Sequence, residues 1–486
     1  MEKEIKNLKP QALWSHFARI CSIPHPSGHE AALREHVVKW AEEKKIECVV
    51  DTTGNVILRK PATPGLEDRK GIILQVHLDM VPQKNGDKKF DFEKDAIEPL
   101  VNGDWVIANG TTLGADNGIG LAAILAVFET EDIKHGPIEA LLTIEEETGM
   151  FGAFGLKPGL LKGDILMNLD SEDEGELYVG CAGGMDANIA FKYKEIAPPA
   201  GSKALKIEVK GLQGGHSGIQ IITQRANANK VLFRFLDAQS RKAELLIASV
   251  DGGGLRNAIP REATAIIVVP ADKASGIAAA AADYLKTLRT EFDKIEDNIQ
   301  FTVTEAAMPA KAIDAATGNA LIKSVHAAPN GVIKMSTSME NLVQTSTNLA
   351  RVISANGEIR IQCLLRSSMN SEKADLGMMI ASLFELAGAK VELTGDYDGW
   401  NPNMDSPILH AMIASYEKLY GKKPEVMAIH AGLECGIIGG PYPNLDMISF
   451  GPTIRFPHSP DEKVEIPSVL KFWDFLCFTL GNAPKK

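Results

Sequence analysis

Five residues of types that bind divalent metals follow apolar runs or glycine-containing turns along this sequence. They are His77, Asp116, Glu147, Asp170 and His458. Two imidazoles and several carboxylates form the mixed nitrogen and oxygen ligand set that zinc, cobalt and manganese accept. Each residue alone has an ordinary structural explanation, so the hypothesis of a metal centre depends on whether the fold brings them together.

His77 and Asp79 come directly after the apolar run 71–76. Because side chains alternate between the two faces of a strand, both residues lie on one side of the chain. A metal-bound imidazole needs such a carboxylate nearby to fix its tautomer and raise its basicity. The spacing therefore suits a metal ligand and its orienting partner, although a His–Asp pair at a strand end explains it without a metal.

Three consecutive glutamates, Glu145, Glu146 and Glu147, follow a predicted strand at 138–144. Adjacent carboxylates repel one another unless cations neutralise some of them. On a solvated loop such a run has no special meaning. At the carboxyl end of a buried strand it is costly unless a cation lies beside it, so this run is a second candidate for a metal-binding segment.

The remaining candidates lie at predicted boundaries of elements. Asp116 begins a helix rich in small residues at 117–128, where the alternative interpretation is an N-cap. Asp170 follows the apolar strand 164–169 and so reaches the same sheet edge as His77, where open α/β sheets bind ligands. His458 lies in a loop stiffened by prolines, where a lone histidine is more often structural.

Two styles of sequence indicate two domains. Short apolar runs alternate with helices up to about Met185 and again after Trp400, which predicts an α/β fold with a mostly parallel central sheet flanked by helices. Between them, segment 203–305 has the β-α-β-β-α-β order of a split βαβ unit, and segment 316–395 repeats that order from its first helix onward. We therefore expect a discontinuous catalytic domain, 1–186 and 397–486, interrupted by an α+β lid domain of two ferredoxin-like halves at 187–396.

Two helix starts have capping signals. Ser406 followed by Pro407 predicts an N-cap and a first helical position for a helix at 407–420. Ser27 and Glu30 have the spacing of a capping box, which predicts a helix that continues to about Lys44.

The overall composition excludes several classes of protein. With 486 residues, 45% of them hydrophobic, the chain is too long for a single core. Its net charge of −12 with interspersed charges argues against a nucleic-acid partner. The start of the sequence lacks the apolar core of a signal peptide, and the longest apolar run is too short to cross a membrane. Six cysteines without a CxxC pair suit a reducing compartment, so we expect a cytoplasmic protein.

Several motifs together resemble the co-catalytic zinc aminoacylase and carboxypeptidase family, and their order and spacing extend over nearly the whole chain. They are His-x-Asp at 77–79, Gly-Ala-Asp-Asn at 114–117, Glu-Glu-x-Gly at 146–149, Asp170, Gly-Gly-His-Ser at 214–217 and Pro-His-x-Pro-Asp-Glu at 457–462. Within that family the chain looks like the branch that hydrolyses aminoacyl-histidine dipeptides. The resemblance implies a metal-dependent peptidase that acts on small peptides.

The resemblance also implies how the metal ligands are shared. One ion, zinc in the first place and cobalt or manganese as substitutes, would be bound by His77 and Asp170. A second would be bound by Glu147 and His458, and Asp116 would bridge both.

Two further residues would complete the catalytic site. Asp79 would orient His77. Glu146 would be the general base, because a carboxylate that already binds zinc is too acidic to take a proton.

For the lid, the resemblance implies that His216 stabilises the oxyanion, against the alternative of a turn histidine. Asn257 and Arg366 would hold the substrate, and the guanidinium suits bidentate capture of a terminal carboxylate. Either could equally be a surface strand residue. Glu434 could contact the free amine of the substrate, although a solvated loop carboxylate is an equally good interpretation.

Several functional alternatives stay open at this point. The same metal site would serve a tripeptidase or an N-acyl amino acid deacylase, and a non-catalytic metal-binding scaffold would have lost Glu146, Asp79 or His216, all of which are present. A phosphate-binding loop at 114–120 is excluded because it has neither GxGxxG nor the P-loop lysine. A monomer with a doubled lid and a homodimer fit the length equally well.

Overall fold

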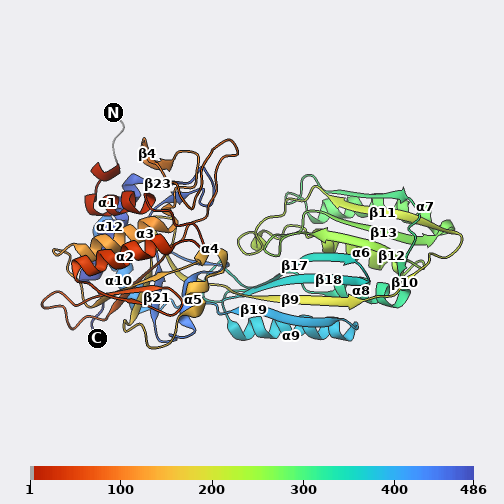
Figure 1. Cartoon of the computed structure of the whole chain (residues 1–486). Helices are drawn as coiled ribbons and strands as arrows, with labels where there is room; N and C mark the ends of the chain where they lie inside the picture. The colour runs from red at the N-terminus through yellow and green to blue at the C-terminus, as the bar shows by residue number, and fades with distance from the viewer. Residues whose placement is uncertain (1–4) are drawn as a thin grey trace. The chain divides into compact units, whose positions relative to one another are not determined.

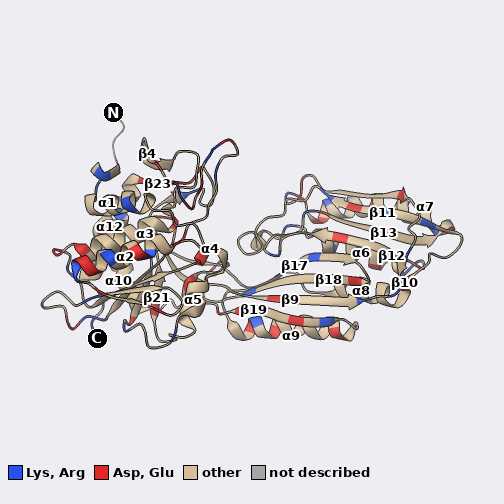
Figure 2. Cartoon of the chain, viewed as in Figure 1, with Lys and Arg blue, Asp and Glu red and all other residues tan. Residues whose placement is uncertain are grey.

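The computed structural model describes residues 5–486, which divide into two compact units (Figure 1). Unit 1 comprises residues 5–180, 402–428 and 433–486, and unit 2 comprises Cys181–Asn401 and Ile429–Gly432. Lys, Arg, Asp and Glu residues are interspersed in both units (Figure 2). No helix within residues 5–486 combines the length and the apolar character that crossing a membrane requires.

An eight-stranded sheet forms the centre of unit 1, with the order β1-β2-β6-β3-β7-β21-β8-β20. The bounds of its strands are β1 Glu47–Val50, β2 Val56–Lys60, β3 Ile72–His77, β6 Ile138–Thr143, β7 Ile165–Asn168, β8 Glu176–Cys181, β20 Glu425–Ile429 and β21 Asp446–Ser449.

This sheet is mixed, which corrects the prediction of a mostly parallel one. The pairs β3–β6, β3–β7 and β7–β21 are parallel, whereas β1–β2, β2–β6 and β8–β21 are antiparallel. The five residues between β1 and β2 are too few for the crossover that a parallel pair needs. Asp51 closes that turn by accepting hydrogen bonds from the backbone N–H groups of Thr53 and Gly54 at 2.9 and 2.8 Å.

The central strands β3, β6 and β7 are buried at every position. Strands covered on both faces read as continuous apolar runs, which is why these three were visible in the sequence. The helices around the sheet are α1 Gln11–Cys21, α2 Ala31–Lys44, α3 Ala115–Glu129, α10 Pro407–Tyr420 and α12 Ile466–Gly481. The parallel strands have their carboxyl ends at one edge of the sheet, and the candidate metal ligands His77 and Asp170 lie at that edge.

One capping prediction is confirmed and the other is wrong. The Ser406 hydroxyl accepts a hydrogen bond from the backbone N–H of Leu409 at 3.2 Å, and a proline stands in the first turn of α10. At α2, by contrast, Ser27 does not cap the helix, because its hydroxyl donates to the carbonyl of Met80 at 3.3 Å. Glu30 is the N-cap residue, but its carboxylate accepts the backbone N–H of Glu145 at 3.1 Å instead. Both side chains bind backbone groups of distant segments and are therefore not available to cap the helix.

Unit 2 contains a nine-stranded sheet with the order β14-β11-β13-β12-β17-β18-β9-β19, and β16 also pairs with β17. The bounds are β9 Gly183–Lys192, β11 Ser202–Lys210, β12 Leu246–Gly253, β13 Ala263–Pro270, β14 Gln300–Ala306, β16 Gly331–Met335, β17 Val343–Ala355, β18 Glu358–Ser367 and β19 Lys390–Tyr397. Its helices are α6 Ala228–Ser240, α7 Ala271–Glu291, α8 Ala315–Ala327 and α9 Asn370–Leu386.

Strand β9 has a place that the sequence did not reveal. It lies between β18 and β19 and pairs with both in antiparallel fashion, so a strand from the start of unit 2 joins strands near its end. The segment at 316–395, which lacked a first strand in the sequence, obtains one in this way. Phe191 of β9 packs against Phe384 of α9 with ring centroids 6.3 Å apart, within one apolar core that extends through the unit.

Candidate metal centre

All five predicted metal ligands lie in unit 1, and the structure brings them together. Each comes from a different segment of the chain. His77 is the last residue of β3, Asp116 lies in the first turn of α3, Glu147 belongs to the short helix α4 Glu146–Gly149, Asp170 follows β7, and His458 lies in the loop between β22 Ile454–Arg455 and β23 Lys463–Glu465.

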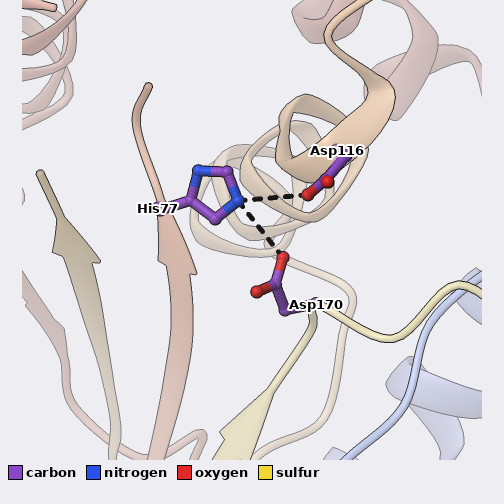
Figure 3. A group of neighbouring side chains, drawn as sticks. All are labelled: His77, Asp116 and Asp170. Carbon is purple, nitrogen blue, oxygen red and sulfur yellow. Dashed lines mark hydrogen bonds and ion pairs between the residues drawn. The ribbon is translucent and has the colours of Figure 1, made fainter. Parts of the chain in front are cut away.

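His77, Asp116 and Asp170 form a first group of ligand atoms that all lie within 4.8 Å of one another. The Nε2 atom of His77 is 3.1 Å from Oδ1 of Asp116 and 3.3 Å from Oδ1 of Asp170 (Figure 3). The amide of Asn117 donates a hydrogen bond to the same oxygen of Asp170 and so orients this carboxylate. Asn117 stands next to Asp116 in the sequence, and that adjacency was the only signal that could have pointed to it.

His458 forms a second group with Asp116 and Glu147. Its Nε2 atom is 3.2 Å from Oδ2 of Asp116 and 3.0 Å from Oε1 of Glu147. The two carboxylate oxygens of Asp116 therefore face two different imidazoles. A carboxylate in this position can bridge two ions, one beside each histidine.

The tautomer of His77 provides a test of whether the site fits a metal. Its Nδ1 atom lies 3.0 Å from the backbone carbonyl of Asp79, an acceptor, so Nδ1 holds the proton. In a neutral ring the Nε2 atom then has no proton and carries a lone pair. That lone pair faces oxygens of Asp116 and Asp170, an arrangement that is repulsive unless a cation lies between them. The donor set therefore fits a divalent metal, with a proton as its competitor.

The pKa values of the ligands reflect this competition. Burial lowers the pKa of His77, but Asp170 and Asp116 outweigh it and hold the pKa well above its usual value. Hydrogen bonds with Asp116 and Glu147 raise the pKa of His458 to about 11. Burial, with Asp116 and Glu147 nearby, raises the pKa of Asp170 to about 6. The cluster carries an excess of carboxylate charge that binds positive charge strongly.

Asp79 supports the glutamate segment as well as His77. It is 1% exposed, and its Oδ1 and Oδ2 atoms accept the backbone N–H groups of Glu146 and Glu147 at 3.0 and 3.2 Å. Burial alone would raise the pKa of Asp79, but the contact with His77 leaves it at about 2, so the group is ionised. One carboxylate thus orients a ligand on β3 and fixes the turn that carries two glutamates.

Glu146 lies at the start of α4, and its carboxylate groups with His77 and Glu147 within 4.8 Å. Burial and the neighbouring carboxylates of Asp170 and Glu434 raise the pKa of Glu146 well above its usual value, although His77 opposes them. A carboxylate with a raised pKa is a better proton acceptor than an ordinary one.

Glu434 does not lie on a solvated loop, so that interpretation is wrong. It is the first residue of α11 Glu434–Gly439 and is 1% exposed. Its Oε2 atom accepts hydrogen bonds from Gln75 Nε2 at 2.6 Å and from Thr143 Oγ1 at 2.7 Å. Among the described residues Oε1 has no hydrogen-bond partner. Burial, aided by Asp170, raises the pKa of Glu434 to about 7.

The other three predicted residues lie in unit 2. His216 is half-buried, and its Nδ1 atom accepts the backbone N–H groups of Gly218 and Ile219 at 3.2 Å each. Asn257 is exposed and lies next to the segment that carries His216, because its backbone carbonyl accepts the N–H of Ser217 at 2.8 Å. Arg366 on β18 is 6% exposed. Burial and then the positive charge of Arg366 lower the pKa of His216.

Sequence reasoning assigned no role to His430, a member of unit 2 that is 7% exposed. Its Nε2 atom lies 2.7 Å from the hydroxyl of Ser346. Burial first and then the charge of Arg366 lower the pKa of His430 to about 3, so the ring is neutral. No spacing rule could have paired residues 84 positions apart.

An α/β unit that gathers two imidazoles, three carboxylates and a further glutamate at one sheet edge defines a hydrolytic metalloenzyme. The chain belongs to peptidase family M20/M25/M40, whose family model matches residues 73–480. It is 48% identical over 483 residues to the cytosol non-specific dipeptidase of Escherichia coli (strain K12), covering 99% of this chain and 100% of that protein.

Solved structures agree with this assignment. The crystal structure of aminoacylhistidine dipeptidase from Vibrio alginolyticus matches with a TM-score of 0.95 and 50% identity, covering 100% of this chain and 99% of that one. Aminopeptidase PepT from Bacillus cereus matches with a TM-score of 0.58 and 16% identity over 98% of this chain and 99% of that one, which indicates a shared fold.

Proposed function

We propose that this protein is a cytoplasmic metal-dependent dipeptidase that hydrolyses Xaa-His and other dipeptides with two divalent ions, zinc in the first place and cobalt or manganese as substitutes. The observation that carries the proposal is the position of Asp116, whose two oxygens face the imidazoles of His77 and His458 separately. The names of the E. coli and Vibrio relatives, both dipeptidases at about half identity, support the substrate class.

In this proposal the five ligands divide into two sets around Asp116. His77 and Asp170 would hold one ion, Glu147 and His458 would hold the other, and Asp116 would be shared between the two sets. When bound, the ions polarise the scissile carbonyl and lower the pKa of a water molecule. Asp79 keeps the Nδ1 proton of His77 in place, so that Nε2 is free to act as a ligand.

Glu146 takes a proton from the attacking water and delivers it to the leaving amine. Its backbone is fixed by the hydrogen bond from its N–H to Asp79, which limits how far the carboxylate can move. The raised pKa of Glu146 favours acceptance of the proton. The same group can return the proton, because the collapse of the tetrahedral intermediate needs an acid where the attack needed a base.

For unit 2 we propose the lid role and the substrate-binding roles. His216 donates through Nε2 to the oxyanion, and its Nδ1 atom, which accepts two backbone N–H groups, leaves the proton on Nε2. Arg366 binds the terminal carboxylate of the peptide, supported by its burial and by a buried Nε that has no acceptor within the described residues. Asn257 adds a polar contact beside His216.

We also propose that Glu434 contacts the free amine of the substrate. The charges of His77 and Asp170 act on its carboxylate, Oε1 has no hydrogen-bond partner among the described residues, and two hydrogen bonds to Oε2 hold the group in one orientation. This contact would separate a dipeptidase from an N-acyl amino acid deacylase, whose substrates have no free amine.

The proposal is tested with purified protein and a panel of Xaa-His dipeptides, other dipeptides, tripeptides and N-acetylated amino acids. Dialysis against a chelator should abolish dipeptide cleavage, and zinc, cobalt or manganese should restore it. Preferred cleavage of tripeptides or of N-acyl amino acids would replace the proposed substrate class. Metal-loaded protein that cleaves no member of the panel would refute the proposed function. Sedimentation of the same sample distinguishes a monomer from a homodimer.

A further inference from the structure

Glu462 is a buried carboxylate that binds the segment carrying Asp116. It is 2% exposed, and it accepts four hydrogen bonds from consecutive backbone N–H groups. Its Oε2 atom accepts from Leu113 at 2.8 Å and Gly114 at 3.1 Å, and its Oε1 atom accepts from Ala115 at 2.8 Å and Asp116 at 3.3 Å. A single carboxylate thus satisfies every backbone donor of a four-residue segment.

The segment needs an external acceptor because its backbone is irregular. Gly114 has φ 70°, and Asp116 has φ −84° and ψ 108°, values that interrupt the helical conformation inside the first turn of α3. The first N–H groups of a helix have no acceptor within the helix itself. Glu462 supplies these acceptors, so the backbone that aims Asp116 is fixed by a residue 346 positions away.

Glu462 also belongs to the loop that carries His458. Its own N–H donates to the carbonyl of Ser459 at 3.0 Å, and the hydroxyl of Ser459 donates to the carbonyl of Phe456 at 2.9 Å. His458 lies between these contacts with φ 59°, a left-handed conformation that non-glycine residues adopt only where the surroundings impose it. One side chain therefore connects the loop of His458 to the segment of Asp116.

We propose that Glu462 is a positioning residue that holds Asp116 and His458 in the relative positions needed to bind two metal ions. It contacts neither the substrate nor the reacting atoms, and acts through the backbone of one ligand and the loop of the other. The inference rests on the proposed two-metal site. It adds a residue outside the predicted ligand and catalytic sets on whose hydrogen bonds the second ion depends.

The test compares Glu462→Gln with a matched control. A glutamine keeps one acceptor oxygen. In place of the other oxygen it has an NH₂ group, which cannot accept hydrogen bonds from the two backbone N–H groups that this oxygen binds in the wild type. Glu139→Gln is the control, because Glu139 is 6% exposed in the same unit and accepts the backbone N–H groups of Lys162 and Gly163 at 2.6 and 2.8 Å. It lies at the opposite end of β6 from Thr143, away from the ligands.

Binding of Zn²⁺ to metal-free protein is measured by competition with a chromophoric chelator, and Co²⁺ absorption reports ligand geometry. For Glu462→Gln we expect the second ion to bind roughly 10- to 100-fold more weakly, an altered Co²⁺ spectrum, and a lower kcat with KM changed less than about threefold. Glu139→Gln should match the wild type in all of these. Glu462→Asp, which keeps the charge but is one methylene shorter, should recover part of the lost affinity.

Three results would overturn the inference. They are wild-type affinity and an unchanged Co²⁺ spectrum in Glu462→Gln, equal losses in Glu139→Gln, and failure of both Glu462 variants to fold, which would assign the residue to stability alone. A wild-type protein that binds two ions but cleaves no peptide would refute the proposed function and leave this test intact.

Discussion

Replacing Asp79 by asparagine should weaken catalysis through the backbone of the glutamates. The two oxygens of Asp79 accept the N–H groups of Glu146 and Glu147 at 3.0 and 3.2 Å, and an asparagine retains one oxygen. One hydrogen bond to a charged acceptor is then lost, which costs about 1.5–3 kcal/mol. If this loss is expressed in the transition state, kcat/KM for a dipeptide falls roughly 10- to 150-fold, because about 1.4 kcal/mol corresponds to a factor of ten.

Asp314→Asn is the matched control for this prediction. Asp314 likewise joins two backbone N–H groups, those of Thr317 and Lys194 at 3.0 Å each, but it lies in unit 2. Both variants should unfold at a lower temperature than the wild type, whereas only Asp79→Asn should lose activity and bound metal. Kinetics, metal analysis and calorimetry on the same samples make the comparison. Full metal content and kcat/KM within about threefold of the wild type in Asp79→Asn would refute the reasoning.

Three further predictions concern metal uptake, stability and substrate binding. Zinc added to metal-free protein at pH 7 should release about two protons, because the pKa of His458 is raised to about 11 and that of His77 well above its usual value. Zinc affinity should therefore rise with pH. Equal affinity at pH 6 and pH 8 would contradict this prediction. Lys230→Met should destabilise unit 2 by about 2–4 kcal/mol, because the Nζ atom of Lys230 donates hydrogen bonds to three backbone carbonyls at 2.6–2.9 Å. Calorimetry should show this loss while kcat/KM stays unchanged. An unchanged melting temperature would contradict the prediction. Glu434→Gln should raise KM for dipeptides about tenfold with a smaller effect on kcat, and an unchanged KM would remove Glu434 from the substrate contacts.

The convergence of the five candidate ligands was predictable because of where they stand. His77 and Asp170 end or follow strands buried on both faces, and such strands are visible as apolar runs whose carboxyl ends meet at one sheet edge. The position of His458 came from motif resemblance, since its loop has no periodic pattern. What metal these residues bind stays a proposal.

The parts that could not be predicted depend on contacts between distant segments. Strand β9 pairs with β18 across more than 150 residues, and no local pattern encodes that partner. Glu30 matched a capping signal, but its carboxylate binds the backbone of Glu145 in the folded unit. Glu434 looked like a loop residue because a short sequence does not show that Gln75 and Thr143 will enclose it.

The measurement that tests the central claim most directly is peptide hydrolysis by Glu146→Gln after reconstitution with zinc. Glu146 is assigned to proton transfer and not to metal binding, so the variant should bind two ions per chain as the wild type does. Its kcat for a dipeptide should fall roughly 10²- to 10⁴-fold, the usual contribution of a general base. A variant that binds both ions and keeps the wild-type kcat, or that loses an ion together with activity, would contradict the account.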